Sequence, residues 1–278
     1  MQSLYWFIAR HYLGAGRDRG LLSLITWIAL GGVTVGVTAL IVVIAVMTGM
    51  QEDLQKKILE STPHVLVLEQ GSSLRMNDWR GVVDTALAVD GVVGAAPFVL
   101  TTVAVTRGTG NASYTQTANL YGVSVDTAGA TATDMERNIL QGALDLEPPA
   151  SGLNPILLGI GLADRMQIFP GDTLVVISFE NLRQGLMGLS PTMRNFEVTG
   201  TFATGMYDYD TQNVYTTLPA AQDLLGLADD DLVSGVGVRT TDAELATRVG
   251  DDIQARLGFP YYVESWKTRN SALFSALK

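Results

Sequence analysis

The sequence predicts an α+β domain of two lobes on a single N-terminal transmembrane helix. One run of apolar residues near the N-terminus contains no charged residue between Gly20 and Gln51. The rest of the chain alternates between segments of helical and strand-like hydrophobic periodicity, which indicates a mixed fold. Many strand-like segments are short and separated by hairpin-length gaps. This pattern favours an α+β organisation, with the lobes divided within residues 110–215.

The apolar run is long enough to span a lipid bilayer. A transmembrane helix needs about 20 apolar residues, and residues 21–47 provide them. A secretory signal peptide has an apolar region of only about 7–15 residues before its cleavage site, whereas this run leads into a polar helical pattern. We therefore assign residues 21–48 to a transmembrane helix and residues 49–62 to a helical stalk that Pro63 ends.

The charges on either side of the run predict its orientation. Arg10, Arg17 and Arg19 precede it, whereas the acidic and basic residues that follow it cancel. The positive-inside rule then places the N-terminus in the cytoplasm and the domain in the periplasm of a Gram-negative cell, with the helix in the inner membrane. Residues 1–20 are rich in aromatic side chains, which predicts a cytoplasmic segment lying along the inner leaflet.

Two glycines in the first half of the transmembrane helix form a small-xxx-small pair. Gly32 and Gly36 lie four residues apart and therefore share one helix face. Such a pair allows a second helix to approach closely. Glycine is also common in membrane helices in general, so a packing role and a neutral role both remain open.

Residues 63–264 form the predicted domain, which periodicity and turn residues divide into strands and helices. The predicted strands are residues 64–68, 118–123, 173–179, 196–202, 213–218, 233–239 and 261–263, with two further short strands around Pro97. Residues 155–166 are predicted as a strand running into a helix. Other helices are predicted from Asn77, at 135–140, from Pro219 to 225, and from Asp242 to 257. A last helix, residues 265–278, begins at the cap residue Ser265.

The composition argues against several kinds of site. The chain has no cysteine and only two histidines, His11 and His64, on opposite sides of the apolar run. Disulfides, thiol catalysis, multi-histidine metal sites and a serine–histidine triad are therefore not expected. The net charge is −10, and because residues through Met50 carry +2 the remainder carries −12, which argues against binding nucleic acid. We expect no catalytic residue, metal or cofactor, and a chain that is not an enzyme.

Three short motifs invite a chemical interpretation that their surroundings do not support. Asp208 and Asp210 flank Tyr209, and at strand spacing the two carboxylates would share a face suited to acid–base chemistry. No histidine joins them, so a role in a turn or at a strand end is expected. The acidic run 229–231 lacks the spacing of a calcium loop, and the glycine pair at 159 and 161 lacks the third glycine of a dinucleotide site.

Four stretches of the chain resemble one family. The opening FIARHYL (7–13) and RGLLSLITWIALGGVTVGVTALIVVIAVMTGMQEDLQKKILESTPHV (19–65) closely resembles the start of the membrane subunits of lipoprotein-releasing (Lol) ABC transporters, the LolC/LolE family. Similar resemblances cover PILLGIGLADRMQIFPGDTLVVIS (155–178), FEVTGTFATGMYDYDTQNVYTTL (196–218) and ESWKTRNSALFSALK (264–278). The resemblance implies a MacB-like periplasmic core domain and a place in the MacB/FtsX-like permease superfamily.

The resemblance also implies partners and a longer protein. Subunits of this family have four transmembrane helices, with the periplasmic domain between the first two, so we expect a fragment or a truncated product in which residues 265–278 return toward a second helix. Implied partners are a cytoplasmic ABC ATPase subunit, a second membrane subunit in a homo- or heterodimer, lipoproteins and a periplasmic lipoprotein carrier. The sequence contains no Gly-Lys pair and hence no Walker A loop, so another chain must hydrolyse ATP.

The resemblance implies a membrane subunit of an ABC transporter that extracts lipoproteins from the inner membrane and hands them to the periplasmic carrier, and it leaves the subunit type open. LolC-like, LolE-like and fused subunits all fit the pattern. An FtsX-like regulator of a cell-wall hydrolase and a MacB-like efflux protein are alternatives from the same superfamily.

Two sets of site residues follow from the resemblance. A loop at residues 181–195 resembles the hook that binds the carrier, and its apolar residues are Leu182, Leu186, Met187, Leu189, Pro191 and Met193. Such a loop could instead pack back onto its own domain. The end of the first helix resembles the lining of the lipoprotein cavity, at Val43, Val46, Met47, Met50 and Leu54. Ordinary lipid-facing residues would have the same composition.

Overall fold

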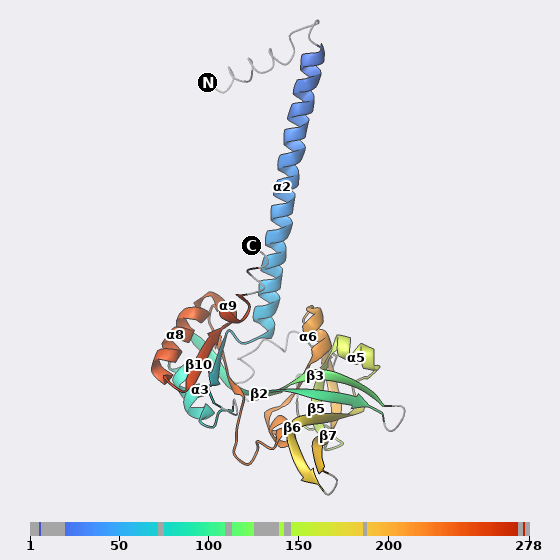
Figure 1. Cartoon of the computed structure of the whole chain (residues 1–278), viewed down its shortest axis with the longest axis vertical. Helices are drawn as coiled ribbons and strands as arrows, with labels where there is room; N and C mark the ends of the chain where they lie inside the picture. The colour runs from blue at the N-terminus through green and yellow to red at the C-terminus, as the bar shows by residue number, and fades with distance from the viewer. Residues whose placement is uncertain are drawn as a thin grey trace. The chain divides into compact units, whose positions relative to one another are not determined.

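A computed structural model of the chain describes residues 20–71, 75–108, 113–124, 139–141, 146–185 and 188–271, together with Trp6 and Ser275. The chain divides into two compact units, residues 1–54 and residues 55–276, and each is described by itself. Helix α2 (Gly20–Ser61) runs without interruption from the first unit into the second (Figure 1).

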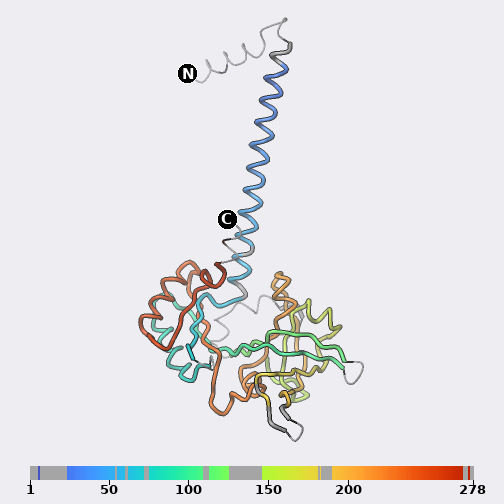
Figure 2. Tube along the Cα trace, in the orientation of Figure 1, coloured from blue at the N-terminus to red at the C-terminus, as the bar shows by residue number. Residues whose placement is uncertain are grey.

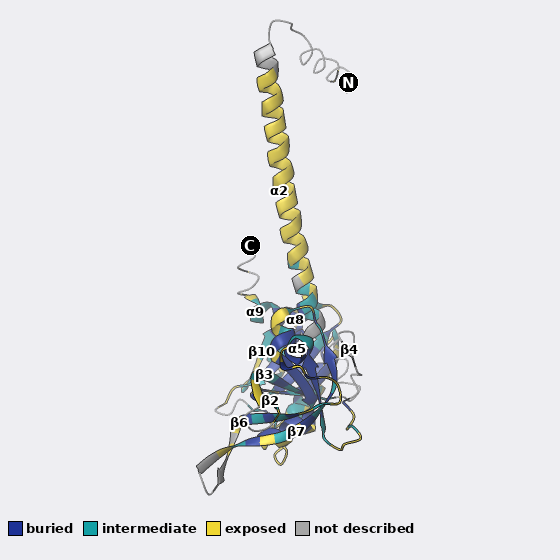
Figure 3. Ribbon diagram, turned by 90° about the vertical axis from the view of Figure 1, so that its right-hand side faces the viewer, coloured by how far each residue is buried: buried dark blue, intermediate teal, exposed yellow. Residues whose placement is uncertain are grey.

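The first unit consists of the long N-terminal part of α2. Side chains from Leu24 to Met50 are exposed along its whole length (Figure 3). A helix rises about 1.5 Å per residue, so this segment is longer than the roughly 30 Å hydrocarbon layer requires. Within the described ranges, α2 is the one helix long and apolar enough to cross a membrane, by length and composition.

The second unit is built around a ten-stranded mixed sheet. Along the main path the strand order is β10-β1-β9-β2-β3-β8-β5-β7-β4, and β6 pairs with β2 and β7. The strands are β1 (Val65–Glu69), β2 (Val92–Arg107), β3 (Tyr114–Val123), β4 (Ile139–Gln141), β5 (Asn154–Gly159), β6 (Thr173–Gly185), β7 (Gly188–Phe202), β8 (Asn213–Thr217), β9 (Gly235–Thr240) and β10 (Tyr261–Ser265). The helices are α3 (Trp79–Leu87), α5 (Ile160–Met166), α6 (Tyr207–Gln212), α7 (Leu218–Leu225), the 3₁₀ turn η3 (Ala243–Leu245), α8 (Ala246–Leu257) and α9 (Trp266–Arg269).

Two groups of elements lie on either side of β2. Figures 1 and 2 show β1, β10, α3 and α8 on one side and β3, β5, β6, β7, α5 and α6 on the other. One continuous hydrophobic cluster includes Val65 and Ile253 from the first group and Leu162 and Phe196 from the second. The predicted α+β class with one N-terminal apolar helix is confirmed, whereas the predicted domain boundaries remain predictions.

The prediction of two short strands around Pro97 is wrong. β2 runs as one strand through this residue, and its irregularity lies between Val92 and Gly94. Pro97 is paired only with β9, because pairing with β3 begins at Phe98. A strand position with a partner on one side only tolerates the missing backbone N–H of proline.

Other local expectations are corrected by the structure. Asp78, not Asn77, caps α3 by accepting a hydrogen bond from the amide of Gly81 at 3.3 Å. The helix predicted at 135–140 is wrong for residues 139 and 140, which belong to β4, and its remainder lies outside the described residues. Asp242 caps the turn η3 that precedes α8.

The last predicted helix is interrupted at Asn270, while the described residues Ser271 and Ser275 are again helical. Ser265 caps α9 by accepting from the amide of Thr268 at 3.3 Å. α9 ends at Arg269, and Asn270 forms a turn where an unbroken helix to 278 was predicted. Most residues beyond Ser271 lie outside the described part of the chain.

Candidate functional site

The predicted hook is the end of a long β-hairpin. Strands β6 and β7 pair in antiparallel register from Thr173 opposite Glu197 to Gly185 opposite Gly188, with an irregularity between Ser178 and Arg183. The prediction of a loop at 181–195 is therefore wrong, because β6 extends to Gly185 and β7 begins at Gly188. Figure 3 shows the hairpin projecting from the rest of its unit.

The hairpin carries exposed apolar side chains. Met193 is 52% exposed and Leu182 is 43% exposed, while Pro191 is half-buried. Phe179 is 59% exposed on the same hairpin and was not among the predicted residues, although its place among polar neighbours at a strand end is a signal that could have marked it. Leu186 and Met187 lie outside the described residues, as does the side chain of Leu189.

Polar contacts fix the base of the hairpin. Glu180 accepts a hydrogen bond from the hydroxyl of Thr101 at 2.6 Å and forms an ion pair with Arg75. On the other strand, Nε of Arg194 donates to a carboxylate oxygen of Asp223 at 2.7 Å, and this hydrogen bond raises the pKa of Arg194. The base is thus tied to β2 and α7, and the exposed side chains of Phe179 and Met193 lie next to these tied residues, with Leu182 further along the hairpin.

The predicted residues of α2 share one helix face. Successive residues turn by about 100°, which places Val43, Val46, Met47, Met50 and Leu54 on the same side. The first four are exposed, and the side chain of Leu54 is not described. Gly32 and Gly36 lie on open helix surface, where an added methyl group would meet nothing within 4 Å.

The carboxylates of Asp208 and Asp210 do not converge on a common site. The strand spacing assumed for them is wrong, because both residues lie in helix α6. Asp208 is exposed, whereas Asp210 is buried and accepts hydrogen bonds from the amide of Thr204 at 2.7 Å, its hydroxyl at 2.9 Å and the amide of Gly205 at 3.1 Å. Asp210 therefore has the expected structural role: it holds the turn before α6.

The two other discounted motifs have structural roles. An added methyl group at Gly159 would lie 2.3 Å from the carbonyl oxygen of Asp210, so this glycine allows β5 to lie close to α6. Asp231 forms an ion pair with Arg80 and accepts from the side-chain amide of Gln222 at 3.1 Å. Within the described ranges, no three histidine, aspartate or glutamate side chains gather where they could hold a metal ion.

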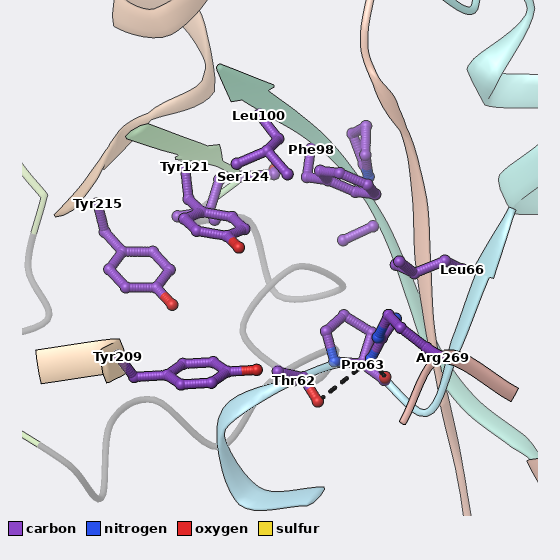
Figure 4. A pocket seen from close by; sticks show the side chains of 14 residues that line it. Thr62, Pro63, Leu66, Phe98, Leu100, Tyr121, Ser124, Tyr209, Tyr215 and Arg269 are labelled. Carbon is purple, nitrogen blue, oxygen red and sulfur yellow. Dashed lines mark hydrogen bonds between the residues drawn. The ribbon is translucent and has the colours of Figure 1, made fainter. Parts of the chain in front are cut away.

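A cavity of about 220 Å³ lies where segments distant in the sequence meet (Figure 4). It is lined mainly by apolar groups, together with one arginine and several hydroxyls. The lining residues are Thr62, Pro63, Leu66, Ala96, Pro97, Phe98, Leu100, Tyr121, Val123, Ser124, Tyr209, Tyr215, Gly237 and Arg269. Sequence reasoning missed this cavity, because no local pattern relates residues near 62, 121, 209 and 269.

Burial controls the ionisation of the polar groups around the cavity. Burial raises the pKa values of Tyr121, Tyr209 and Tyr215, so their hydroxyls stay protonated. Burial lowers the pKa of Arg269, whose guanidinium donates to the carbonyl oxygen of Pro63 at 3.2 Å and to the hydroxyl of Thr62 at 3.4 Å. The rings of Tyr121 and Tyr215 stack with centroids 5.1 Å apart. The cavity thus presents hydrogen-bond donors within aromatic and aliphatic walls.

A comparison with models of protein families shows to which family the chain belongs. The family model of the MacB-like periplasmic core domain matches residues 26–256. The chain belongs to the MacB-like periplasmic core domain family. This match extends from within α2 to the end of α8, and it confirms the predicted fold family.

Curated relatives of this MacB-like chain are named as LolC or LolE transmembrane proteins of the lipoprotein-releasing system. The lipoprotein-releasing system transmembrane protein LolC of Xylella fastidiosa (strain Temecula1 / ATCC 700964) is 30% identical over 98% of the chain. LolC of Neisseria meningitidis serogroup B is 28% identical over 100% of it. The chain spans 62% and 64% of the length of these two relatives. The predicted resemblance to the LolC/LolE family is confirmed.

One solved structure aligns with part of the chain. The extracellular domain of the ABC-type transporter YknZ from Gram-positive bacteria aligns with a TM-score of 0.48 at 13% identity, covering 72% of the MacB-like chain and 99% of that domain. The family match and the apolar helix α2 together support an inner-membrane protein with a periplasmic domain of the MacB type.

Proposed function

We propose that the chain works as part of a membrane subunit of an ABC transporter that extracts lipoproteins from the inner membrane and hands them to a periplasmic carrier. One observation carries this proposal: the chain aligns over 98% of its length with a protein named as a lipoprotein-releasing transmembrane subunit. The proposed arrangement has the N-terminus in the cytoplasm and residues after Met50 in the periplasm, as the arginines before the apolar run favour.

The proposed subunit does not catalyse a reaction itself. A separate cytoplasmic ATPase would supply the energy, and a second membrane subunit would complete the transporter. Burial of an acyl chain in a bilayer is worth about 0.8 kcal/mol per CH₂ group, so extraction of a lipoprotein needs an energy source and an apolar shelter. The unbroken helix α2 supports a role in transmitting motion, because a continuous helix is stiffer than a linker of irregular structure.

The hairpin is the proposed carrier-binding hook. Phe179, Leu182 and Met193 are exposed apolar side chains on a projecting element whose base is fixed by two ion pairs. Exposed apolar side chains that gather on one element mark interaction surfaces, and methionine adapts to varied partners. These features favour docking of a partner over packing of the hairpin against its own domain.

If one face of α2 lines the lipoprotein cavity, a crosslinker on that face should label lipoprotein and a crosslinker on the opposite face should not. A photo-crosslinking residue at Val43 is expected to label acylated lipoprotein in membranes that contain the ATPase and the second subunit. The same residue at Ile41 should not, because two residues place it about 200° around the helix. Both positions are exposed apolar sites in α2, so they are matched controls. Mass-shifted lipoprotein detected by immunoblot is the measurement, and equal labelling from both positions would contradict the proposal.

The glycine pair predicts an effect on assembly. Replacement of Gly32 and Gly36 together by leucine is expected to weaken association with the second membrane subunit several-fold, because the larger side chains hold a neighbouring helix away. Gly31→Leu is the control, since Gly31 lies about 100° from Gly32 on the helix surface. Quantified co-purification after mild detergent extraction measures the effect. Unchanged assembly of the double variant would leave these glycines without a packing role.

A further inference from the structure

We propose that the cavity beside Arg269 binds a compact carboxylate with an apolar body, its carboxylate directed toward Arg269 and the tyrosine hydroxyls. This inference goes beyond the proposed transport function and does not depend on it. The cavity lies in the domain and is distinct from the hairpin surface and the exposed face of α2. Three observations about its lining support the inference.

The first observation is a group of tyrosine hydroxyls that converge on the cavity. In Figure 4 the hydroxyls of Tyr121, Tyr209 and Tyr215 point into the same space. Within the part of the chain that the structure describes, none of the three makes a hydrogen bond. Tyr215 is buried, Tyr121 and Tyr209 are half-buried, and polar groups in such surroundings nearly always have a partner, which a ligand in the cavity would supply. Because the hydroxyls stay protonated, each can donate to an oxygen of an anion.

The second observation is a half-buried cation, Arg269, that makes no ion pair with a described residue. The guanidinium of Arg269 has five N–H donors. It bonds to two neutral oxygens, those of Pro63 and Thr62. Glu264 is near enough to act on it electrostatically, but among the described residues no carboxylate lies within 4 Å of it. A partly desolvated charge without a counterion is costly, and an anion in the cavity offsets that cost. A carboxylate has about four lone-pair sites, which suits an arginine and several hydroxyls together.

The third observation is the apolar wall. Leu66, Pro97, Phe98, Leu100 and Val123 line the cavity, so the ligand needs a hydrocarbon part as well as a charge. The volume of about 220 Å³ is below the roughly 300–1,000 Å³ of pockets for drug-sized ligands, which limits the ligand to a compact molecule or the end of a larger one. The chain as a whole is strongly acidic, so general electrostatic attraction does not bring a carboxylate here. Recognition must come from the local donors.

The test uses the full chain in lipid nanodiscs with its tyrosines replaced by 3-fluorotyrosine. ¹⁹F NMR signals of Tyr121 and Tyr209 are assigned from the corresponding Tyr→Phe variants. Titration with octanoate, at measured free concentration, is expected to shift both signals saturably. Octanol has the apolar body without the charge and acetate has the charge without the body, so each should bind at least about tenfold more weakly. A second titration uses N-acetylleucine, which imitates the C-terminal residue of a peptide. Comparison of its affinity with that of octanoate distinguishes a peptide C-terminus from a free hydrocarbon acid as the source of the carboxylate.

Variants of the donors make the assignment specific. Arg269→Gln is expected to weaken octanoate binding about tenfold or more, because a charge-assisted hydrogen bond is lost. Arg256→Gln is the matched control: this exposed arginine also bonds to a carbonyl oxygen, that of Ala88 at 2.9 Å, and its loss should leave binding unchanged. If Arg269→Gln impairs folding, Tyr209→Phe keeps the ring and should still weaken binding several-fold.

Three results would overturn the proposal. The first is the absence of a saturable shift with both octanoate and N-acetylleucine, which would mean that water alone satisfies these donors. The second is binding of octanol as tightly as octanoate, which would show apolar filling without recognition of the carboxylate. The third is unchanged octanoate affinity in folded Arg269→Gln and Tyr209→Phe variants.

Discussion

Replacement of Met193 by aspartate is expected to weaken binding of the periplasmic lipoprotein carrier by about 30-fold or more, if the hairpin is the hook proposed above. Met193 is 52% exposed, and its partner across the hairpin is Ile177. Interface side chains that dominate binding cost about 2 kcal/mol or more when truncated, and every 1.4 kcal/mol is a factor of ten. A buried carboxylate in the interface adds a desolvation penalty to the loss of apolar contact.

The measurement is carrier binding to the full chain in nanodiscs by biolayer interferometry. Phe169→Asp is a stringent control, because Phe169 is 66% exposed and lies just before the far end of β6 from the hairpin turn. It makes the same change of charge and removes more apolar surface, yet it should bind the carrier like the unmodified chain. Circular dichroism of each variant checks that the domain is folded. Wild-type affinity in a folded Met193→Asp variant would rule out this side chain as a carrier contact.

Local sequence patterns predicted most of the elements in the domain. The cap at Ser265, the strand and helix within residues 155–166 and the helix at Pro219 all depend on interactions within a few residues. Such features can be inferred from spacing because the chain near each residue decides them. The long apolar run was evident for the same reason.

The predictions from sequence were wrong where pairing between distant strands decides the local structure. Pro97 interrupts the strand pattern of the sequence, but β9 on one side of it keeps the strand continuous. Residues 181–185 and 188–195 are strands because β6 and β7 pair with each other, although the glycines among them suggested a loop between two strands. Strand preference depends on cross-strand neighbours more than on the residues themselves, and one sequence does not reveal those neighbours.

The candidate sites also differ in whether nearby residues or distant ones form them. The hairpin residues are close in sequence and were found as a group, whereas the lining of the cavity comes from positions between 62 and 269. Arg269 gave no signal in the sequence, since a basic residue at the end of a short helix commonly lies in solvent. Its burial beside Thr62 and Pro63 depends on long-range pairing such as that of β1 with β10.

Replacement of Asp210 by alanine is expected to destabilise the domain by about 3 kcal/mol or more. The carboxylate accepts three hydrogen bonds, two from Thr204 and one from Gly205, and it is only 7% exposed. Each hydrogen bond to a charged group contributes about 1.5–3 kcal/mol, and donors left buried without a partner add to the loss. Asp210→Asn keeps one acceptor oxygen for Thr204 but cannot accept from Gly205 in the same geometry, so an intermediate loss is expected.

Asp208→Ala separates this structural role from the acid–base alternative. Asp208 is exposed in the same helix, and substitutions at such surface positions usually change stability by no more than about 0.5 kcal/mol. Guanidinium unfolding of the full chain in detergent, followed by tryptophan fluorescence, measures all three variants, because Trp79 and Trp266 lie in the domain and Trp266 is buried. Equal losses for the two alanine variants would contradict the role assigned to Asp210. Because α6 also carries Tyr209 into the cavity, folded Asp210→Ala protein should lose octanoate affinity while Asp208→Ala keeps it.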